Sequence, residues 1–183
     1  LDFLVAWLAQ QVQDPAQHTT VAILLQGLQG VGKDIIFEFF RKHVLGERVG
    51  FKTSKPSSDI FGEHSVSLHD RVFLLVDDIN GNEIRPLMSR LKDLVTSHTM
   101  HVNPKNQPAY DVLNLANLLF TTNTSNPIQI DPQERRFSVF ECNSSRIDDT
   151  VYFSWLFKYL QRDDVARAFF QYLYYRIDVS PFL

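Results

Sequence analysis

The segment between residues 27 and 33 has the composition and spacing of a loop that binds phosphate groups. It follows the apolar run Val21–Leu25 and precedes a helix-like stretch, Ile35–Leu45. Glycines let successive backbone N–H groups turn toward an anion, and the following helix adds its positive dipole end. Lys33 supplies a point charge for the β- and γ-phosphates. We therefore predict a nucleotide site, with ATP as the ligand, made by these residues: Gly27, Gln29, Gly30, Val31, Gly32, Lys33 and Asp34.

Asp34 departs from the usual pattern of such loops. A Ser or Thr hydroxyl that binds magnesium commonly stands at this position. A carboxylate also binds Mg²⁺, but beside a triphosphate it adds repulsion unless the metal neutralises it. We therefore expect Mg²⁺ as a cofactor, Asp34 among its ligands, and nucleotide binding that depends strongly on magnesium.

Two further groups of polar side chains follow apolar runs that are typical of buried strands. Asp77 and Asp78 come directly after Val72–Val76, and Asn123 comes directly after Leu118–Thr122. In an open α/β sheet the ligand lies beyond the carboxyl ends of the strands, so these groups converge on one crevice. We predict that Asp77 binds the metal, that Asp78 activates a water molecule and that Asn123 positions it. The alternative is that both segments are ordinary polar turns.

The order of the predicted elements favours an α/β protein with a mainly parallel sheet flanked by helices. We expect helices over residues 1–13, 35–45, 83–96, 151–160 and 163–175, and strands over 20–26, 72–76, 118–122 and 137–141. A β-hairpin is expected around residues 104–108, before the 118–122 strand, while residues 53–69 have no clear periodicity. The expected core face of the 35–45 helix comprises Ile36, Phe39, Phe40 and Val44. Gly46 is expected to end this helix in a left-handed conformation.

Length and composition fit one globular domain of 183 residues. We divide it into a core, residues 1–142, whose leading helix lies in residues 1–19, and a C-terminal helical segment, residues 143–183, which either completes the same domain or lines a subunit interface. A single cysteine, Cys142, excludes an intrachain disulfide and favours an intracellular protein. No apolar run approaches the roughly 20 residues of a membrane span, so a soluble domain is expected. The net charge of −3 means that nucleic acid must be bound by a local basic surface. Because the chain begins at Leu1 inside a helical pattern, we expect it to be part of a longer protein.

The motifs occur in the order seen in superfamily 3 helicases, and the chain resembles the AAA+ helicase domain of a viral or phage primase-helicase. The segments that carry the resemblance are 27–33, 77–78, 92–105, 118–123 and 134–136. The resemblance spans roughly residues 1–142 and implies a P-loop NTPase fold of AAA+ type. In that family Lys33 corresponds to the P-loop lysine, the Asp77–Asp78 pair to the second nucleotide motif, and Asn123 to the polar sensor.

The resemblance also implies roles for basic residues outside the loop. Arg135 or Arg136 corresponds to an arginine finger that acts on the neighbouring subunit, which implies a homo-oligomeric ring, a hexamer. Lys105 corresponds to the lysine of a hairpin that grips single-stranded DNA, and Lys92 and His101 add to the positive field of the channel. The alternatives are an arginine paired with Glu134, solvated Lys105 and Lys92 side chains, and a packed His101.

These expectations define an ATP-dependent replicative DNA helicase domain, associated or fused with a primase and independent of membranes. The resemblance implies a location in the host cytoplasm, or in the nucleus if the source is viral. Its catalytic residues are expected to be Lys33, Asp78, Asn123, Arg135 and Arg136. Two other classes stay open: a P-loop kinase acting on a small acceptor, and a non-catalytic module that assembles in response to a nucleotide. ATP hydrolysis measured with and without single-stranded DNA separates the three.

Overall fold

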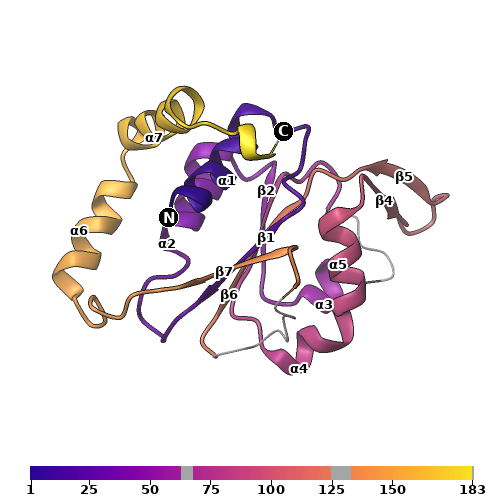
Figure 1. Ribbon diagram of the computed structural model, residues 1–183, viewed down its shortest axis with the longest axis horizontal. Helices are drawn as coiled ribbons and strands as arrows, with labels where there is room; N and C mark the ends of the chain where they lie inside the picture. Colours follow the sequence, from indigo (N-terminus) through magenta and orange to yellow (C-terminus); the bar gives the residue numbers. More distant parts are fainter. Residues whose placement is uncertain (63–67, 125–132, 183) are drawn as a thin grey trace.

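The computed structural model describes residues 1–62, 68–124 and 133–182. A five-stranded sheet lies between two helical layers, and every strand pair in it is parallel (Figure 1). The strand order is β2-β3-β6-β1-β7, so the first strand lies inside the sheet. The strands are β1 Ala22–Gln26, β2 Gly50–Thr53, β3 Phe73–Val76, β6 Asn117–Thr122 and β7 Phe137–Glu141. The predicted α/β fold with a mainly parallel sheet is therefore confirmed.

Seven α-helices and three helical segments of other geometry are present in the described part of the chain. The α-helices are α1 Asp2–Gln13, α2 Ile35–Phe39, α3 Pro56–Asp59, α4 Gly81–Ile84, α5 Met88–Thr96, α6 Thr150–Leu160 and α7 Asp163–Arg176. A π-helix, Phe40–Leu45, continues α2, and the 3₁₀ segments are Arg85–Leu87 and Ser180–Phe182. None of the helices in residues 1–62, 68–124 and 133–182 has the length and apolar character that crossing a membrane requires.

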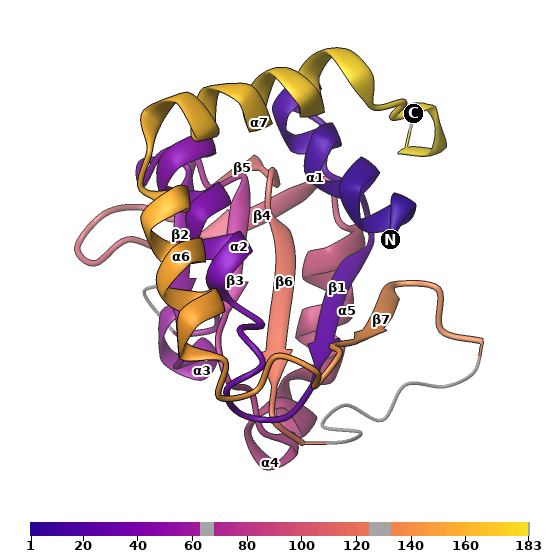
Figure 2. The ribbon, with the colours of Figure 1, turned by 90° about the vertical axis from the view of Figure 1, so that its left-hand side faces the viewer.

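The two faces of the sheet are covered by different helices. Side chains alternate along a strand, so Leu24 and Leu74 face one layer while Ile23 and Leu75 face the other. The first face packs against α4 and α5, and the second against α1, α2 and α7. Burial on both faces explains why β1, β3 and β6 are continuous apolar runs. Figure 2 shows α1, α2 and α7 together on one side of these strands.

The C-terminal helix α7 belongs to the same packed core as the first helix. Leu173 is fully buried in the layer that contains Trp7. The Gln13 side-chain amide donates hydrogen bonds to the carbonyl oxygens of Leu173 and Ile177, at 2.7 and 2.8 Å. The end of the chain therefore contributes to the packing of the sheet layer.

Two predicted helices are interrupted, and the strand β2 was not predicted. The helix expected over 35–45 changes from α to π geometry at Phe40, and Ile36 is 38% exposed rather than buried. Gly46 has the expected positive φ of 89° but a ψ of 150°, which is not the left-handed helical conformation. The helix expected over 83–96 is divided by the 3₁₀ turn that contains Pro86. The stretch without periodicity, 53–69, begins at the end of β2 and contains α3, and its residues 63–67 lie outside the described part.

The expected hairpin is formed by β4 Thr99–Val102 and β5 Tyr110–Leu113, which pair antiparallel. It leads into the first residue of β6, whereas the phosphate-loop segment follows the last residue of β1. Because β1 and β6 are parallel, the hairpin and the loop lie at opposite ends of the sheet (Figure 2).

Candidate phosphate-binding site

The 27–33 loop lies beyond the carboxyl end of β1, held beside the end of β6. The Gly27 N–H donates to the carbonyl oxygen of Thr122 at 3.3 Å. Gly30 and Gly32 have φ values of 85° and 78°, a conformation that L side chains rarely adopt. The loop geometry therefore requires glycine at both positions.

Lys33, Asn123 and Asp78 form one chain of hydrogen bonds across the ends of three strands. The Lys33 ammonium donates to Asn123 Oδ1 at 2.6 Å and to the carbonyl oxygens of Gly27 and Leu28, each at 2.9 Å. Asn123 Nδ2 in turn donates to Asp78 Oδ1 at 2.7 Å. The structure thus brings together three side chains that lie 45 or more residues apart in the sequence. We call these three residues and the 27–33 loop the phosphate site.

Asp78 has a backbone conformation that suits its place at the end of β3. Its φ is 51°, which is uncommon for a residue other than glycine and recurs at functional sites. Its backbone N–H donates to Thr121 Oγ1 at 2.9 Å, and this hydroxyl donates to Asp77 Oδ1 at 2.7 Å. The turn directs Asp78 toward Asn123 and Asp77 toward β2.

Lys52 is the residue of this region that the sequence analysis missed. Its ammonium lies 3.1 Å from Asp77 Oδ2, 3.2 Å from Glu38 Oε1 and 3.5 Å from Asp34 Oδ2. Burial alone raises the pKa of Asp77, but the Thr121 hydroxyl and Lys52 outweigh it and leave this pKa below its ordinary value. We call Asp34, Glu38 and Asp77 around Lys52 the carboxylate cluster.

The carboxylate cluster does not fit a metal ion held by the protein. Both of the predicted ligands, Asp34 and Asp77, already contact the Lys52 ammonium. Across residues 1–62, 68–124 and 133–182, no group of three or more His, Cys, Asp and Glu side chains is arranged to hold a metal. We therefore derive no step through magnesium.

A cavity of about 570 Å³ opens over the phosphate site. Its polar lining includes Lys33, Asp78 and Asn123, and its apolar wall is made by Phe153 and Phe157 of α6. Asp149 caps the N-terminus of α6, and its carboxylate accepts a hydrogen bond from the Tyr152 N–H at 2.9 Å. The cavity therefore combines one cation, amide groups and the carboxylates of Asp34, Asp77 and Asp78 with aromatic rings from the C-terminal segment.

Replacing Gly32 with alanine is expected to destabilise the loop more than replacing Gly30. Both positions have positive φ, which costs about 1–2 kcal/mol for a residue with a Cβ. A Cβ on Gly32 would also lie 2.8 Å from Phe153 Cε1, whereas nothing lies within 4 Å of one on Gly30. We expect Gly32→Ala to lose about 1 kcal/mol more than Gly30→Ala in urea unfolding. Equal losses would show that the Phe153 contact does not constrain the loop.

The predicted basic residues around Glu134 form a separate ion-pair group. Glu134, whose side chain is 6% exposed, accepts from Lys92 Nζ at 2.7 Å and from Arg136 Nη1 at 2.9 Å. Arg135 is exposed and has no hydrogen-bond or ionic partner among the described residues. Of the two candidate arginine fingers, Arg136 therefore adopts the alternative arrangement, paired with Glu134. The finger role itself is not tested by these contacts and stays a prediction.

The ion pairs of Glu134 predict a dependence of stability on acid pH. The hydrogen bond from Lys92, followed by those from Arg136, lowers the pKa of Glu134 from 4.5 to about 2. This stabilisation is complete above pH 4.5 and is lost as the pH falls toward 2. We expect Glu134→Gln to reduce stability at pH 7 by about 1 kcal/mol, since its partners are partly exposed. Thermal unfolding at pH 7 and pH 3 checks this, and the difference between variant and wild type is expected to shrink at pH 3.

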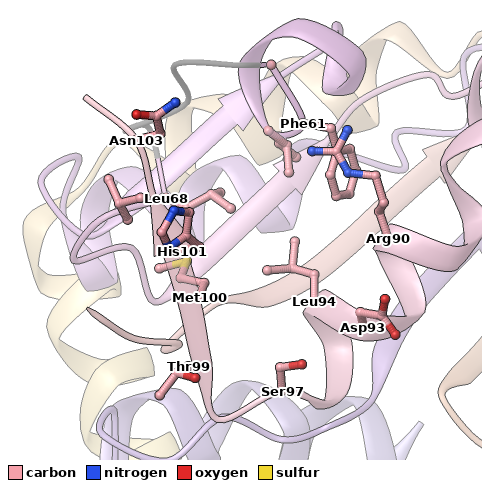
Figure 3. A pocket seen from close by; sticks show the side chains of 13 residues that line it. Phe61, Leu68, Arg90, Asp93, Leu94, Ser97, Thr99, Met100, His101 and Asn103 are labelled. Atoms are coloured by element: carbon pink, nitrogen blue, oxygen red, sulfur yellow. The ribbon is translucent and has the colours of Figure 1, made fainter. Parts of the chain in front are cut away.

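His101 and Lys105 lie on the hairpin, away from the phosphate site. His101 Nδ1 is 2.9 Å from Asp111 Oδ1 across the β4–β5 pair, and both side chains are exposed. Lys105 is exposed at the turn between the strands. Another cavity, of about 480 Å³, lies beside His101, where the guanidinium of Arg90 covers the Phe61 ring at 5.0 Å (Figure 3). It shares no lining residue with the cavity over the phosphate site.

Fold and site together define an α/β protein with a parallel sheet and a basic, glycine-containing loop at its carboxyl edge. The sequence matches a family described as Family of unknown function (DUF5906) over residues 25–136. This match covers more than half of the chain, which therefore belongs to that family.

A curated protein and solved structures of one phage are similar to this chain. The chain is 24% identical over 147 residues to a protein of Nitratiruptor phage NrS-1 named DNA Primase-polymerase, a match that covers 79% of this chain and 20% of that protein. The A form apo structure of the NrS-1 C terminal region has a TM-score of 0.80 at 23% identity, covering 97% of this chain and 42% of that one. A second apo structure of the region gives 0.79 at the same identity and coverage. This chain thus spans about one fifth of the phage protein and about two fifths of the solved region.

These findings correct the function predicted from the sequence. The prediction of a DNA helicase was wrong, because the named relative is a DNA primase-polymerase. The kinase and assembly-module alternatives gain no support from that relative either. The prediction of ATP and Mg²⁺ as cofactors was also wrong: the relative's name does not indicate an ATP-driven enzyme, and the described residues form no metal cluster.

Proposed function

We propose that this chain is the nucleotide-phosphate-binding domain of a phage-type primase-polymerase, an enzyme that acts in DNA synthesis. The relative's printed name supports the class of enzyme. One observation carries the assignment of the site: Lys33, Asn123 and Asp78 are joined by hydrogen bonds at the carboxyl edge of the sheet. This edge is where ligands bind in open α/β sheets. The proposed ligand is a deoxynucleoside triphosphate used as a substrate, and the proposal includes no ATP hydrolysis.

The phosphate site has the groups that binding a triphosphate requires. Two of the acceptors of Lys33 are carbonyl oxygens of its own loop, and phosphate oxygens are stronger, charged acceptors for the same ammonium. The positive-φ glycines allow backbone N–H groups to face the anion. Asn123 keeps Asp78 and Lys33 in register, since its amide bonds both. Lys52 offsets the charge of three nearby carboxylates that would otherwise repel the ligand.

We further propose that β1, the loop and α2 form a P-loop unit in an AAA+-like sheet. Support comes from the placement of β1 between β6 and β7, with the basic loop leading directly into a helix. The proposal concerns the fold only. Ring assembly and a fused primase domain remain predictions from the sequence.

Binding of a deoxynucleoside triphosphate tests the proposed function. We expect saturable binding in titration calorimetry, with the largest amide NMR shift changes at Gly30–Lys33. In a polypeptide that contains this domain and synthesises DNA on a single-stranded template, Asn123→Ala is expected to raise the KM for nucleotide. An absence of binding, or shift changes confined to the hairpin, contradicts the assignment.

We also propose that Lys105 contacts single-stranded DNA. It is an exposed cation at the tip of a hairpin, and a lysine there neutralises one phosphate. We expect Lys105→Ala to weaken binding a few-fold for all sequences and to reduce the salt-dependence slope by about 1. Fluorescence anisotropy with a labelled oligonucleotide measures both, with the exposed Lys158 of α6 replaced by alanine as the control. An unchanged salt-dependence slope would show that Lys105 does not contact the DNA.

A further inference from the structure

A third cavity, of about 290 Å³, lies between α6 and the helix that follows the loop. It shares three lining residues with the cavity over the phosphate site: Asp34, Ile35 and Phe157. Because the same three side chains line both cavities, the two cavities are adjacent. We call the smaller cavity the α2–α6 groove. It lies next to the cavity that Lys33 lines.

The apolar part of the groove is formed by Ile35, Phe39, Phe157 and Leu160, and it includes an aromatic face without a ring partner in the described residues. Phe39 and Leu160, which are 5% and 9% exposed, form its buried base. Phe157 is 51% exposed at the junction of the two cavities. Other exposed rings of α6, such as Trp155 and Tyr159, stack on each other at 5.2 Å. Within the described part of the chain no ring contact of this kind involves Phe157, which leaves its face available to a planar ligand.

The rim of the groove carries hydrogen-bonding side chains that are exposed. Lys42, His43 and Gln161 line it from both helical sides, and the carboxylates of Asp34 and Glu38 line it as well. The His43 ring stacks on Phe39 with centroids 5.7 Å apart, which fixes the position of the imidazole. A slot that combines apolar side chains with polar groups matches the chemistry of a nucleobase, which has apolar faces and polar edges.

We infer that the α2–α6 groove holds the base of the nucleotide whose phosphates lie on Lys33, with Phe157 as the stacking residue. This inference rests on the proposed function and adds the part of the ligand that gives affinity beyond the phosphates. Because every base has a stacking face, the apolar walls accept purines and pyrimidines alike. All four deoxynucleoside triphosphates are therefore expected to bind within a few-fold of one another. Such tolerance suits a site that serves DNA synthesis.

Comparison of a deoxynucleoside triphosphate with inorganic tripolyphosphate tests the inference. In titration calorimetry we expect the nucleotide to bind the wild-type chain about 10-fold more tightly, because stacking adds to the phosphate contacts. Phe157→Ala is expected to remove this advantage and to leave the affinity for tripolyphosphate unchanged. Phe157→Tyr keeps the ring and is expected to retain it. Trp155→Ala, an exposed aromatic residue of the same helix outside the groove, is the matched control.

The outcomes separate the inference from the proposed function. If neither ligand binds, the phosphate site is wrong and the base site fails with it. If both bind wild type equally, the phosphate site stands and the base site is overturned. A Phe157→Ala variant that weakens both ligands by the same factor also overturns it, because the ring then acts through the structure of α6.

Discussion

Replacing Lys33 with alanine is expected to lower the affinity for a deoxynucleoside triphosphate by about 10- to 100-fold. The ammonium is the one lysine nitrogen lining the described part of the phosphate cavity, and a hydrogen bond between charged groups contributes about 1.5–3 kcal/mol. In the variant, water can donate to the two carbonyl oxygens and to the Asn123 oxygen that now accept hydrogen bonds from Lys33. We therefore expect the fold to persist, with little change in unfolding temperature.

Lys105→Ala is the matched control for Lys33→Ala, because it removes the same charge at the opposite end of the sheet. Titration calorimetry at several salt concentrations measures both variants. A general field effect would weaken nucleotide binding equally in the two and would fade with added salt. Equal losses of nucleotide affinity would therefore show that Lys33 does not bind the phosphates directly.

Replacing Lys52 with methionine is expected to affect both stability and binding. The variant keeps most of the side-chain volume but leaves Asp34, Glu38 and Asp77 without their shared cation. Breaking a buried pair costs about 3–5 kcal/mol, and the 28% exposure of Lys52 reduces this to about 2 kcal/mol. Two of these carboxylates also line the phosphate cavity, so we expect nucleotide affinity to fall about 10-fold.

A double-mutant cycle separates the loss of the cation from a loss of packing. Asp77→Asn removes one of the repelling charges, so in the Lys52→Met background it is expected to recover part of the stability and affinity. In the wild-type background the same change removes a favourable ion pair and is expected to destabilise the folded protein. Urea unfolding and calorimetry of the four proteins measure the coupling. Strictly additive effects would show that Lys52 and Asp77 do not act together.

The central strands could be predicted because each of them is a continuous apolar run in the sequence. β1, β3 and β6 are covered on both faces, which requires apolar runs. The runs of β3 and β6 are followed directly by Asp77–Asp78 and by Asn123, and that of β1 by the loop that ends in Lys33. The prediction that Lys33, Asp78 and Asn123 meet needed only the parallel order of these strands. Their direct hydrogen bonds are consistent with that prediction, whereas their roles remain proposals.

The edge strand β2 could not be predicted, because its sequence lacks the apolar run that marks the central strands. It has four residues, begins with Gly50 and includes Lys52, so it has no apolar run. Missing β2 meant missing the cation between Asp34 and Asp77, and both acids were then interpreted as metal ligands. The change from α to π geometry at Phe40 was also invisible, because it depends on packing rather than on local propensity.

The helicase prediction failed at the step from motifs to activity. The order of the loop, the acidic pair and the asparagine reflects how strands are arranged in a sheet, and one arrangement supports different activities. Neither Arg135 nor Lys105 contacts the phosphate site in the described residues, so nothing in the geometry tied them to it. Only the comparison with a named relative separated the classes of enzyme.

A crystal structure of the chain with a bound deoxynucleoside triphosphate tests the central claim most directly. The account predicts phosphate oxygens within hydrogen-bonding distance of Lys33 Nζ and of the backbone N–H groups of the 27–33 loop, with Asn123 still bonded to Asp78. Phosphates bound elsewhere, with the Lys33 ammonium still on the carbonyl oxygens of Gly27 and Leu28, would contradict it.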